Sequence, residues 1–446
     1  MRNTKAIKTN FNTLIKKIYG LKHASRIEQM RQLSREEFYT YQNQELVKQW
    51  KYVIENTPYY KSRKEYESAS LNLKSSLEEN LAKLPILKKA EVKRFNQDFW
   101  SKGYHLLNTT HTTSGTSGTP LKIKGSINER SLTTQVLHNW YKDLTGKTNY
   151  KILTLSGFMV PEKDELFWVD PFTKNTYLSI YDLRSRNVNR IIDMLENTKP
   201  DIIYGYASAI GNLSDILSEN DYKLKKEVIV INTSEVLDDN NRKKITKNLG
   251  NILNLYGSQE GAHLAVECFE GSLHVHPLIG IIELLDDNGL KVPEGELGRV
   301  IVTSLSKKTM PLLRYDIGDL AYASDIVCSC GSSWPTIGRV LGRQEDQVLR
   351  ADGSKVPLLS FHALKNIASV KEGQLIQENF NSFKFNLVLV DGIDKDSIKK
   401  IEERIIKEIK TRLDINNINV HFNYVDEIPR GPNGKFKSVV VEKFYE

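Results

Sequence analysis

The sequence predicts an α/β protein with a large domain of layered α/β sheets, a β-rich subdomain and a small α+β domain at the C-terminus. Between residues 151 and 256, short apolar segments typical of buried strands alternate with helical segments, which is the pattern of α/β layers. The last part of the chain holds a strand, a long helix and another strand, enough for a small domain. At 446 residues the chain can form two or three domains.

Three regions follow from this pattern. Residues 1–83 are rich in Lys, Glu, Gln and Leu, and we expect a helical region there. Residues 84–343 form the large domain, and residues 344–446 form the small one. Within the large domain we expect helices at 131–144, around 191–195 and from about 210, and strands at 151–156, 201–205, 227–231 and 252–256.

From about residue 268 to 322 the pattern changes to short strands separated by turns, which indicates the β-rich subdomain. The expected strands are 274–276, 281–285 and 299–303. In the small domain we expect a strand at 383–390, a helix at 396–413 and a strand at 418–424.

The composition limits the class of protein. A net charge of +8 suits an anionic substrate, and we expect no nucleic-acid partner because no run of aromatic and basic residues resembles a stacking platform. No apolar run approaches the roughly 18 residues of a membrane span, and the N-terminus lacks the apolar segment of a secretory signal. Three cysteines make no disulfide framework, so we expect a cytoplasmic protein.

Residues 5–22 place apolar side chains at helical spacing with lysines between them. Such a basic helix can pack on its own domain, or it can make peripheral contact with a membrane surface.

A hydroxyl-rich loop follows at residues 113–119. It consists of Thr113, Ser114, Gly115, Thr116, Ser117, Gly118 and Thr119. Glycine lets backbone N–H groups approach a ligand closely, and the hydroxyls add neutral donors, so the loop suits the phosphates of a nucleotide. No Gly-Lys-Ser/Thr follows, so it is not a Walker A loop. A flexible polar linker is the alternative, but the apolar and polar alternation after Pro120 indicates a strand leaving the loop.

Several later segments could carry chemistry, although each could also be an ordinary solvated turn. Glu260 ends the segment Tyr256-Gly257-Ser258-Gln259-Glu260 and could hold Mg²⁺ beside a phosphate. Asp319 closes a segment, residues 314–319, in which we expect two carboxylates around a turn, and a carboxylate there suits the hydroxyls of a ribose. Arg343, Glu345 and Asp346 form a charged boundary before the small domain, and a loop near the C-terminus presents Lys435.

The order of these motifs resembles the adenylate-forming superfamily of acyl-CoA synthetases, luciferases and peptide-synthetase adenylation domains. More narrowly, the chain is similar to the phenylacetate–CoA ligase branch and its capsular-polysaccharide-biosynthesis relatives. The resemblance covers the chain from about Leu84 to the C-terminus. It implies an adenylation domain followed by a mobile C-terminal domain, with ATP and Mg²⁺ as cofactors.

The resemblance also implies a role for each motif. The loop at 113–119 would grip ATP and then pyrophosphate, Ser234 and Glu235 would line the adenine pocket, and Tyr256 would stack on adenine, with Gly257 and Ser258 after it. Glu260 would hold Mg²⁺, Asp319 the ribose hydroxyls, and Arg343 the ribose or phosphate. Glu345 and Asp346 would form the hinge, and Lys435 would bridge the substrate carboxylate and the α-phosphate. Two positions depart from the pattern, because Asp316 stands where Arg is common and Ile317 where Thr or Ser is common.

This set of groups suits the chemistry of acid activation. Attack of a carboxylate on the α-phosphorus of ATP builds charge on phosphorus, which Mg²⁺, a lysine and hydroxyl donors stabilise. A lysine on a mobile domain can be withdrawn before the second step, in which the family uses a thiol of CoA or of a carrier.

All three cysteines fall in one part of the chain, at Cys268, Cys328 and Cys330, and His274 lies nearby in sequence. Three thiols and one imidazole make a closed set for a structural Zn²⁺, which some phenylacetate–CoA-ligase-like proteins carry. Three unrelated buried thiols are the alternative. His276 is an alternative fourth ligand, and His263 a weaker one.

The resemblance places acyl recognition before the adenine segment, at Tyr204, Gly205, Tyr206 and Ser208, with Phe158 nearby in sequence order. These residues suit an aryl acid or a compact aliphatic or amino acid, and each tyrosine could instead pack an ordinary core. We therefore expect an acid–thiol ligase that uses CoA. The alternatives are acyl transfer to an amine, a sugar or a carrier protein in surface-polysaccharide assembly, and a non-catalytic nucleotide-binding scaffold. A homodimer is also possible on sequence alone.

Overall fold

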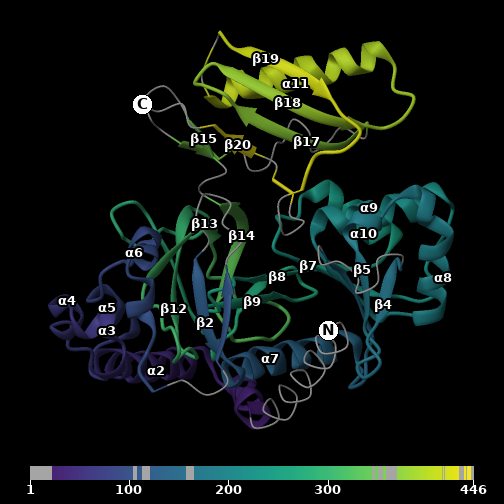
Figure 1. Cartoon of the computed structure of the whole chain (residues 1–446). Helices are drawn as coiled ribbons and strands as arrows, with labels where there is room; N and C mark the ends of the chain where they lie inside the picture. Colours follow the sequence, from purple (N-terminus) through teal and green to yellow (C-terminus); the bar gives the residue numbers. More distant parts are fainter. Residues whose placement is uncertain are drawn as a thin grey trace.

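The computed structural model describes residues 23–103, 108–112, 121–156, 165–343, 347–349, 355–357, 369–413, 415, 417–430, 436–437 and 439–442. Figure 1 shows a body, which contains the described residues up to 343, and a smaller part above it. We call the smaller part, from Gln347 onward, the C-terminal unit. No described helix is long and apolar enough to cross a membrane. The expected basic helix at residues 5–22 lies outside the described residues.

Helices form the first part of the body, and they extend beyond residue 83 (Figure 1). They are α2 (Arg35–Asn56), α3 (Pro58–Lys61), α4 (Lys64–Glu67), α5 (Leu77–Ala82) and α6 (Lys89–Arg94), followed by the 3-10 helix η1 (Asn96–Phe99). Capping boxes start two of them: Ser34 and Glu37 exchange side-chain and backbone hydrogen bonds at α2, and Ser76 and Glu79 do so at α5.

The described strands of the body form one twelve-stranded sheet and a separate hairpin. The order in the sheet is β11-β12-β13-β14-β10-β9-β8-β7-β6-β3-β5-β4. The strands are β3 (Ile152–Ser156), β4 (Phe167–Val169), β5 (Thr176–Ser179), β6 (Ile202–Gly205), β7 (Ile229–Thr233), β8 (Ile252–Gly257), β9 (Leu264–Glu267), β10 (Leu273–Val275), β11 (Gly280–Leu285), β12 (Leu297–Ser304), β13 (Tyr315–Ala323) and β14 (Thr336–Arg343). The hairpin consists of β1 (Asn108–Thr112) and β2 (Lys122–Ser126).

The sheet changes character along its width. Strands β5, β3, β6, β7 and β8 are parallel, whereas β9 to β14 pair in antiparallel fashion. The short strands expected between 268 and 322 are present, but they continue this sheet, because β9 pairs with β8 on one side and with β10 on the other. The parallel half therefore supplies the α/β layers, and the antiparallel half is the β-rich region.

Helices cover both faces of the parallel half. They are α7 (Ile127–Thr145), α8 (Val188–Thr198), α9 (Ala207–Glu219) and α10 (Asp239–Asn248), with short 3-10 turns η2 (Ile180–Asp182) and η3 (Ser185–Asn187) between β5 and α8. Ile203 and Val230 share an apolar cluster with residues of α8, α9 and α10. Their strand neighbours Ile202 and Ile231 share another with residues of α7. Because alternate strand residues face opposite sides, α7 lies on one face and the other three helices on the other.

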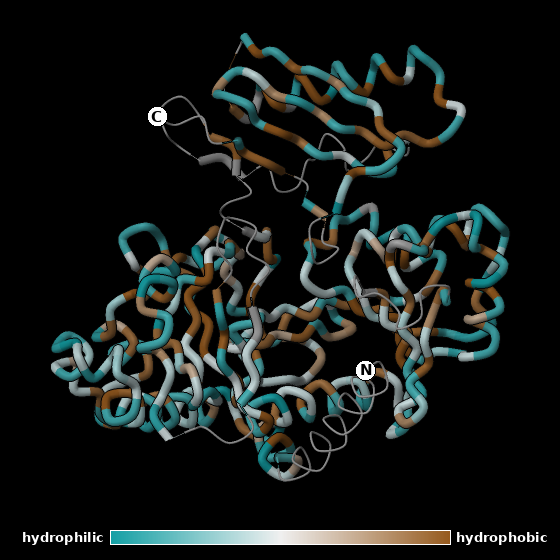
Figure 2. Tube along the Cα trace, viewed as in Figure 1, coloured by the Kyte–Doolittle hydropathy of each residue, from teal (hydrophilic) through white to brown (hydrophobic). Residues whose placement is uncertain are grey.

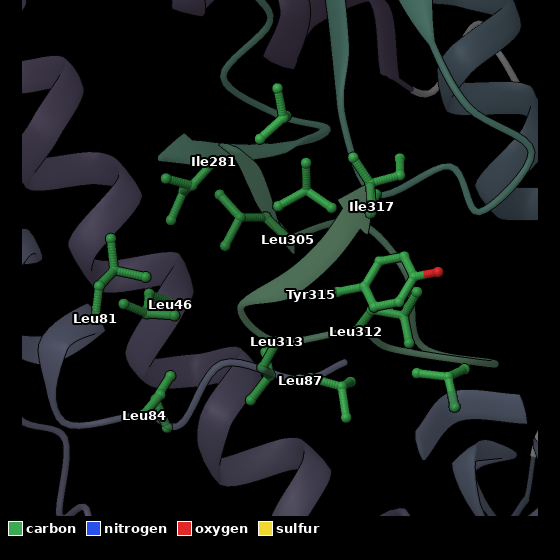
Figure 3. Packing of buried hydrophobic residues seen from close by; sticks show 14 of the residues in the cluster. Leu46, Leu81, Leu84, Leu87, Ile281, Leu305, Leu312, Leu313, Tyr315 and Ile317 are labelled. Atoms are coloured by element: carbon green, nitrogen blue, oxygen red, sulfur yellow. The ribbon is translucent and has the colours of Figure 1, made fainter. Parts of the chain in front are cut away.

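The antiparallel half shares its core with the N-terminal helices. Figure 3 shows this packing, in which leucines from the helical region and the segment after it lie beside residues of β11, β13 and the loop before β13. The labelled residues are Leu46, Leu81, Leu84, Leu87, Ile281, Leu305, Leu312, Leu313, Tyr315 and Ile317. The helices are therefore built into the body. Figure 2 shows the same trend, with brown apolar residues gathered along the strands and teal residues at the outer loops.

The C-terminal unit has a four-stranded sheet of order β19-β18-β17-β20 and one long helix. Its elements are β15 (Gln347–Leu349), β16 (Lys355–Pro357), β17 (Val370–Gln377), β18 (Ser382–Leu389), α11 (Lys395–Leu413), β19 (Asn419–Tyr424) and β20 (Val439–Val441). Ile401, Ile405 and Ile409 of α11 pack on Phe383 and Phe385 of β18 in a core of its own. The expected strand, helix and strand are present, whereas β15, β16, β17 and β20 were not foreseen.

Two local expectations were wrong. Helix α9 begins at Ala207, a few residues before the expected start near residue 210, so Ser208 lies in its first turn. The preceding residue, Tyr206, offers no side-chain cap, which is why the helix start has no local signal. The segment expected to turn before Asp319 is strand β13, which bends at Gly318, where φ is +81°.

Candidate nucleotide and acyl site

A cavity of about 2070 Å³ lies between the body and the C-terminal unit. The carboxyl ends of β6, β7 and β8 open onto it, the usual place for a ligand in a parallel sheet. Of the residues singled out from sequence, Tyr204, Tyr206, Ser208, Ser234, Glu235, Tyr256, Gly257, Ser258, Glu260 and Asp319 line it. The structure therefore brings together residues that lie more than 100 positions apart in the chain.

Tyr256 and Asp319 meet on one wall of this cavity. Tyr256 is at the end of β8, and its hydroxyl donates a 2.8 Å hydrogen bond to Oδ2 of Asp319 in β13. The bond fixes the ring and the carboxylate relative to each other. A flat aromatic face beside a carboxylate suits a nucleoside, whose base can stack while its ribose donates hydroxyl hydrogen bonds.

Arg343 lies directly opposite Asp319, because the two residues are partners in the β13–β14 ladder. The structure describes the backbone of Arg343 but not its side chain. By contrast, the side chain of Asp316 makes its contacts within the fold. Its carboxylate pairs with Arg299 at 2.7 Å and accepts a hydrogen bond from the backbone N–H of Gly318. These two contacts of Asp316 therefore stabilise the bend of β13.

The loop after β7 is held in a strained turn. Ser234 has φ of +65°, a left-handed conformation that costs a residue with a Cβ roughly 1–2 kcal/mol. The Asn232 side chain donates to the carbonyl of Glu235 at 2.8 Å and to Oδ1 of Asn254 at 2.9 Å, which holds the turn in place. Strain of this kind gathers at functional sites.

Glu260 at the cavity wall and Lys307 behind it are two buried side chains of opposite charge that form no ion pair with each other. Their exposed fractions are 3% and 7%, and neither side chain has a hydrogen-bond or ion-pair partner among the described residues. Lys307 Nζ lies 3.5 Å from where a Cβ on Gly261 would be, directly after Glu260. Burial lowers the pKa of Lys307, while the charges of Glu129 and Glu260 oppose that shift. Such groups are costly to bury, so a carboxylate left free at a cavity wall fits a metal ligand.

Three of the four expected acyl-recognition residues line the cavity, and the fourth does not. Tyr204, Tyr206 and Ser208 line the cavity, and burial raises the pKa of Tyr204, so its hydroxyl stays protonated. Gly205 has a different place. A Cβ there would lie 2.9 Å from Cβ of Leu155 in the neighbouring strand β3, so close strand packing explains this glycine.

The remaining predicted residues lie outside the described part of the chain. They are the loop residues 113–119, the hinge residues Glu345 and Asp346, Lys435, and Phe158. Strand β2 does leave the loop as expected, and Thr110 of β1, shortly before the loop, lines the cavity. Phe436, the residue after Lys435, lines it from the C-terminal unit.

Glu235 joins the two parts of the molecule at this cavity. Its Oε2 accepts a 2.9 Å hydrogen bond from the backbone N–H of Ser208, and its Oε1 accepts one of 2.9 Å from the backbone N–H of Phe436. The role of this side chain and the buried Lys307 were both missed from sequence. A pairing of a side chain with a distant backbone group leaves no sequence motif. Lys307 lies between Ser306 and Lys308 in a polar segment, so no residue pattern indicates its burial either.

The three cysteines and His274 converge on one side of the body. Their ligand atoms all lie within 4.8 Å of one another, with Sγ of Cys268 3.6 Å from Sγ of Cys328 and Sγ of Cys330 3.3 Å from Nε2 of His274. His276 lies edge-on to Trp334, with ring centroids 4.7 Å apart, and burial lowers its pKa to about 3. The geometry therefore favours His274 as the fourth member of the set.

Known proteins resemble this chain over most of its length. Protein CapK of Staphylococcus aureus is 24% identical, with 94% of this chain and 92% of CapK covered. Phenylacetate-coenzyme A ligase of Thermus thermophilus is 25% identical, with 92% and 97% covered. The CapK C-terminal domain model matches residues 348–442.

Among solved structures, 2-hydroxyisobutyryl-CoA ligase has the same fold at 15–16% identity. In its postadenylation state the TM-score is 0.73, with 93% of this chain and 92% of the ligase covered. In its thioesterification state the TM-score is 0.58, with 93% and 91% covered.

Fold and relatives point to one class: the chain has the fold of 2-hydroxyisobutyryl-CoA ligase, and along most of its length it is similar in sequence to acid–CoA ligases. Within that class it is similar to phenylacetate–CoA ligase and to CapK, and the unit that matches the CapK C-terminal domain is the one that closes the cavity.

Proposed function

We propose that this protein activates a carboxylic acid with ATP and then transfers the acyl group to a thiol, with CoA as the first candidate. The observation that carries the proposal is the shared cavity. Tyr256, Asp319 and Glu260 lie on its body side, and Phe436, next to Lys435, lies on the other. A nucleotide held by the body could thus meet a cation supplied by the C-terminal unit.

In the first step a carboxylate oxygen attacks the α-phosphorus of ATP. A new P–O bond forms, the bond to the bridging oxygen of pyrophosphate breaks, and pyrophosphate leaves. In the second step the thiolate attacks the acyl carbon, a C–S bond forms, and AMP leaves. Tyr256 and Asp319 would orient the nucleoside, the loop at 113–119 and Arg343 would hold phosphate or ribose oxygens, and Lys435 would stabilise charge at the α-phosphate.

Glu260 would hold Mg²⁺, which would neutralise phosphate charge when bound. The residue fits this role because its carboxylate is buried at the cavity wall and unpartnered among the described residues. Lys307 would add a fixed cation beneath the same wall, in a chain whose phosphate loop has no Walker lysine.

The higher TM-score with the postadenylation state of 2-hydroxyisobutyryl-CoA ligase supports an assignment of the present arrangement to the first step. The two reference structures are of the same ligase, so their different scores reflect arrangement more than sequence. We infer that Glu345 and Asp346 act as the hinge from which the C-terminal unit turns before thioester formation.

The test is ATP–pyrophosphate exchange over a panel of aryl, short aliphatic and amino acids. The proposal requires exchange that depends on one class of acid, because Tyr204, Tyr206 and Ser208 would select it. ATP binding without exchange for any acid would instead favour a nucleotide-binding scaffold.

The acceptor needs its own experiment. Consumption of CoA thiol in the presence of ATP and the best acid would support the acid–thiol ligase. The match of the C-terminal unit to the CapK model supports a second candidate, transfer to an amine, a sugar or a carrier protein, because this unit would face the acceptor. Exchange without CoA consumption would select that second candidate.

We also propose a structural Zn²⁺ held by Cys268, His274, Cys328 and Cys330. A tetrahedral zinc with bonds of about 2.0–2.3 Å places its ligand atoms roughly 3.3–3.8 Å apart, which is close to the observed 3.6 Å and 3.3 Å, and all four ligand atoms lie within 4.8 Å of one another. The ion would tie the turn between β9 and β10 to the loop before β14. Elemental analysis of protein purified without chelator should find one zinc per chain, and its absence would reject the site.

A further inference from the structure

Glu235 uses both of its carboxylate oxygens on backbone N–H groups that belong to different parts of the molecule. Oε2 accepts from Ser208 in the first turn of α9, and Oε1 accepts from Phe436 in the C-terminal unit, each at 2.9 Å. We propose that Glu235 is a positioning residue that latches the C-terminal unit, and with it the Lys435 segment, in the arrangement for acid activation. The consequence for catalysis rests on the proposed function.

The body side of the latch is rigid. The N-terminus of α9 has orphan N–H groups, and Tyr206 provides no side-chain cap, so the carboxylate of Glu235 takes the place of a cap. The turn that carries Glu235 is held by the Asn232 side chain, which donates to its carbonyl at 2.8 Å. The carboxylate is therefore fixed relative to Ser208, a residue of the proposed acid pocket.

The C-terminal side is equally well tied to its own unit. The guanidinium of Arg430 stacks over the ring of Phe436 at 4.8 Å from the centroid and forms an ion pair with Glu372. Glu372 lies in β17, so Arg430 connects Phe436 to the sheet of the C-terminal unit. A hydrogen bond to the backbone of Phe436 therefore restrains that sheet as well.

Other polar contacts across the same boundary are weaker. Lys371 pairs with Glu219 at 3.4 Å, and Arg184 with Glu427 at 3.7 Å, and all four side chains are at least one-third exposed. Exposed pairs of this kind contribute little, whereas a hydrogen bond to a carboxylate in a partly closed cavity contributes more. A single bond of this strength can hold one arrangement and still be broken at each turnover.

Glu235→Gln is the sharpest change. The amide has one acceptor oxygen, and its NH₂ group would face a second N–H donor, so the side chain can keep only one of the two bonds. Glu219→Gln is the matched control, because it removes a carboxylate from the same boundary without touching the cavity residues that we assign to substrate or nucleotide.

The readout is hydrogen exchange by mass spectrometry on the full-length protein, compared between peptides that cover residues 428–442 and peptides that cover α9. The latch predicts about tenfold faster exchange of the C-terminal peptides in Glu235→Gln and less than a twofold change in Glu219→Gln. Acceleration confined to α9, equal acceleration of both peptide sets, or the same effect in the control would each overturn it.

This measurement needs no substrate, so the latch can fail or hold independently of the proposed reaction. Where an acid supports pyrophosphate exchange, a second readout connects the two. Glu235→Gln should slow ATP–pyrophosphate exchange more than it slows the formation of thioester from the supplied acyl-adenylate of that acid. Equal slowing of both steps would mean that Glu235 does not position the unit for activation.

Discussion

The body and the C-terminal unit differ in what holds them together. Helices α2 to α6 share one apolar core with β11, β12 and β13, and a buried ion pair, Arg314 with Glu283 at 3.0 Å, lies within it. The C-terminal unit has a separate core of its own, and it meets the body through polar contacts around the cavity. The unit can therefore move without exposing an apolar core, whereas the N-terminal helices cannot.

The difference separates binding from positioning. Tyr256, Asp319 and Glu260 all belong to the body, so a nucleotide site made of them would persist in every position of the C-terminal unit. The lysine that the reaction would need lies on the part that can move. Changes in the body should alter stability and nucleotide affinity, and changes at the boundary should alter the rate of one step.

The largest expected effect is on the stability of the body. Arg314→Met leaves the carboxylate of Glu283 buried without its partner, and it also removes the bond from Nη1 of Arg314 to the carbonyl of Leu84. We expect a loss of about 3–5 kcal/mol in the free energy of unfolding, measured by denaturant titration. Lys291→Met breaks a fully surface pair with Glu78 and should cost less than about 1 kcal/mol. Similar losses in the two variants would contradict the comparison.

Substitution of Lys307 shows whether the buried cation contributes to the reaction or to the stability of the fold. Lys307→Met should lower acid-dependent pyrophosphate exchange roughly 10- to 100-fold, while the free energy of unfolding stays the same or rises, because an unpaired buried charge is removed. Lys308→Met is the control, since its ammonium bonds Oε1 of Gln49 away from this wall. Full activity of Lys307→Met would show that the residue has no part in the reaction.

Ser234 should give the smallest effect. Ser234→Gly removes the Cβ that makes φ of +65° unfavourable, and after the entropy cost of glycine we expect a gain of about 0.5–1 kcal/mol in unfolding free energy. Ser234→Ala keeps the strain and should give no gain. If Ser234→Gly is less stable than the native protein, the turn is held by the serine side chain and not by Asn232.

Much of the fold could be predicted because local residue patterns determine it. The alternation of apolar strands and helices between 151 and 256 predicted the parallel half of the sheet, and the strand, helix and strand of the C-terminal unit were also predicted. The continuity of the sheet from β8 to β14 was not, because pairing of distant antiparallel strands has no local signal. The start of α9 was misplaced for the same reason, since its cap comes from Glu235.

The candidate site shows the same division. Tyr256 and Asp319 were predicted as separate contributions to one nucleotide site, and the structure joins them by a hydrogen bond. Cys268, His274, Cys328 and Cys330 were predicted as one cluster, and they lie together. The second bond of Glu235 depends on how the two parts of the molecule meet, which no residue pattern encodes.

The most direct test of this division of labour is the variant Lys435→Ala, with ATP binding and acid-dependent pyrophosphate exchange measured on the same sample. If the body binds the nucleotide and the C-terminal unit supplies the catalytic cation, exchange should fall by roughly 100-fold or more while ATP binding and the unfolding transition are kept. Undiminished exchange in Lys435→Ala would contradict the account.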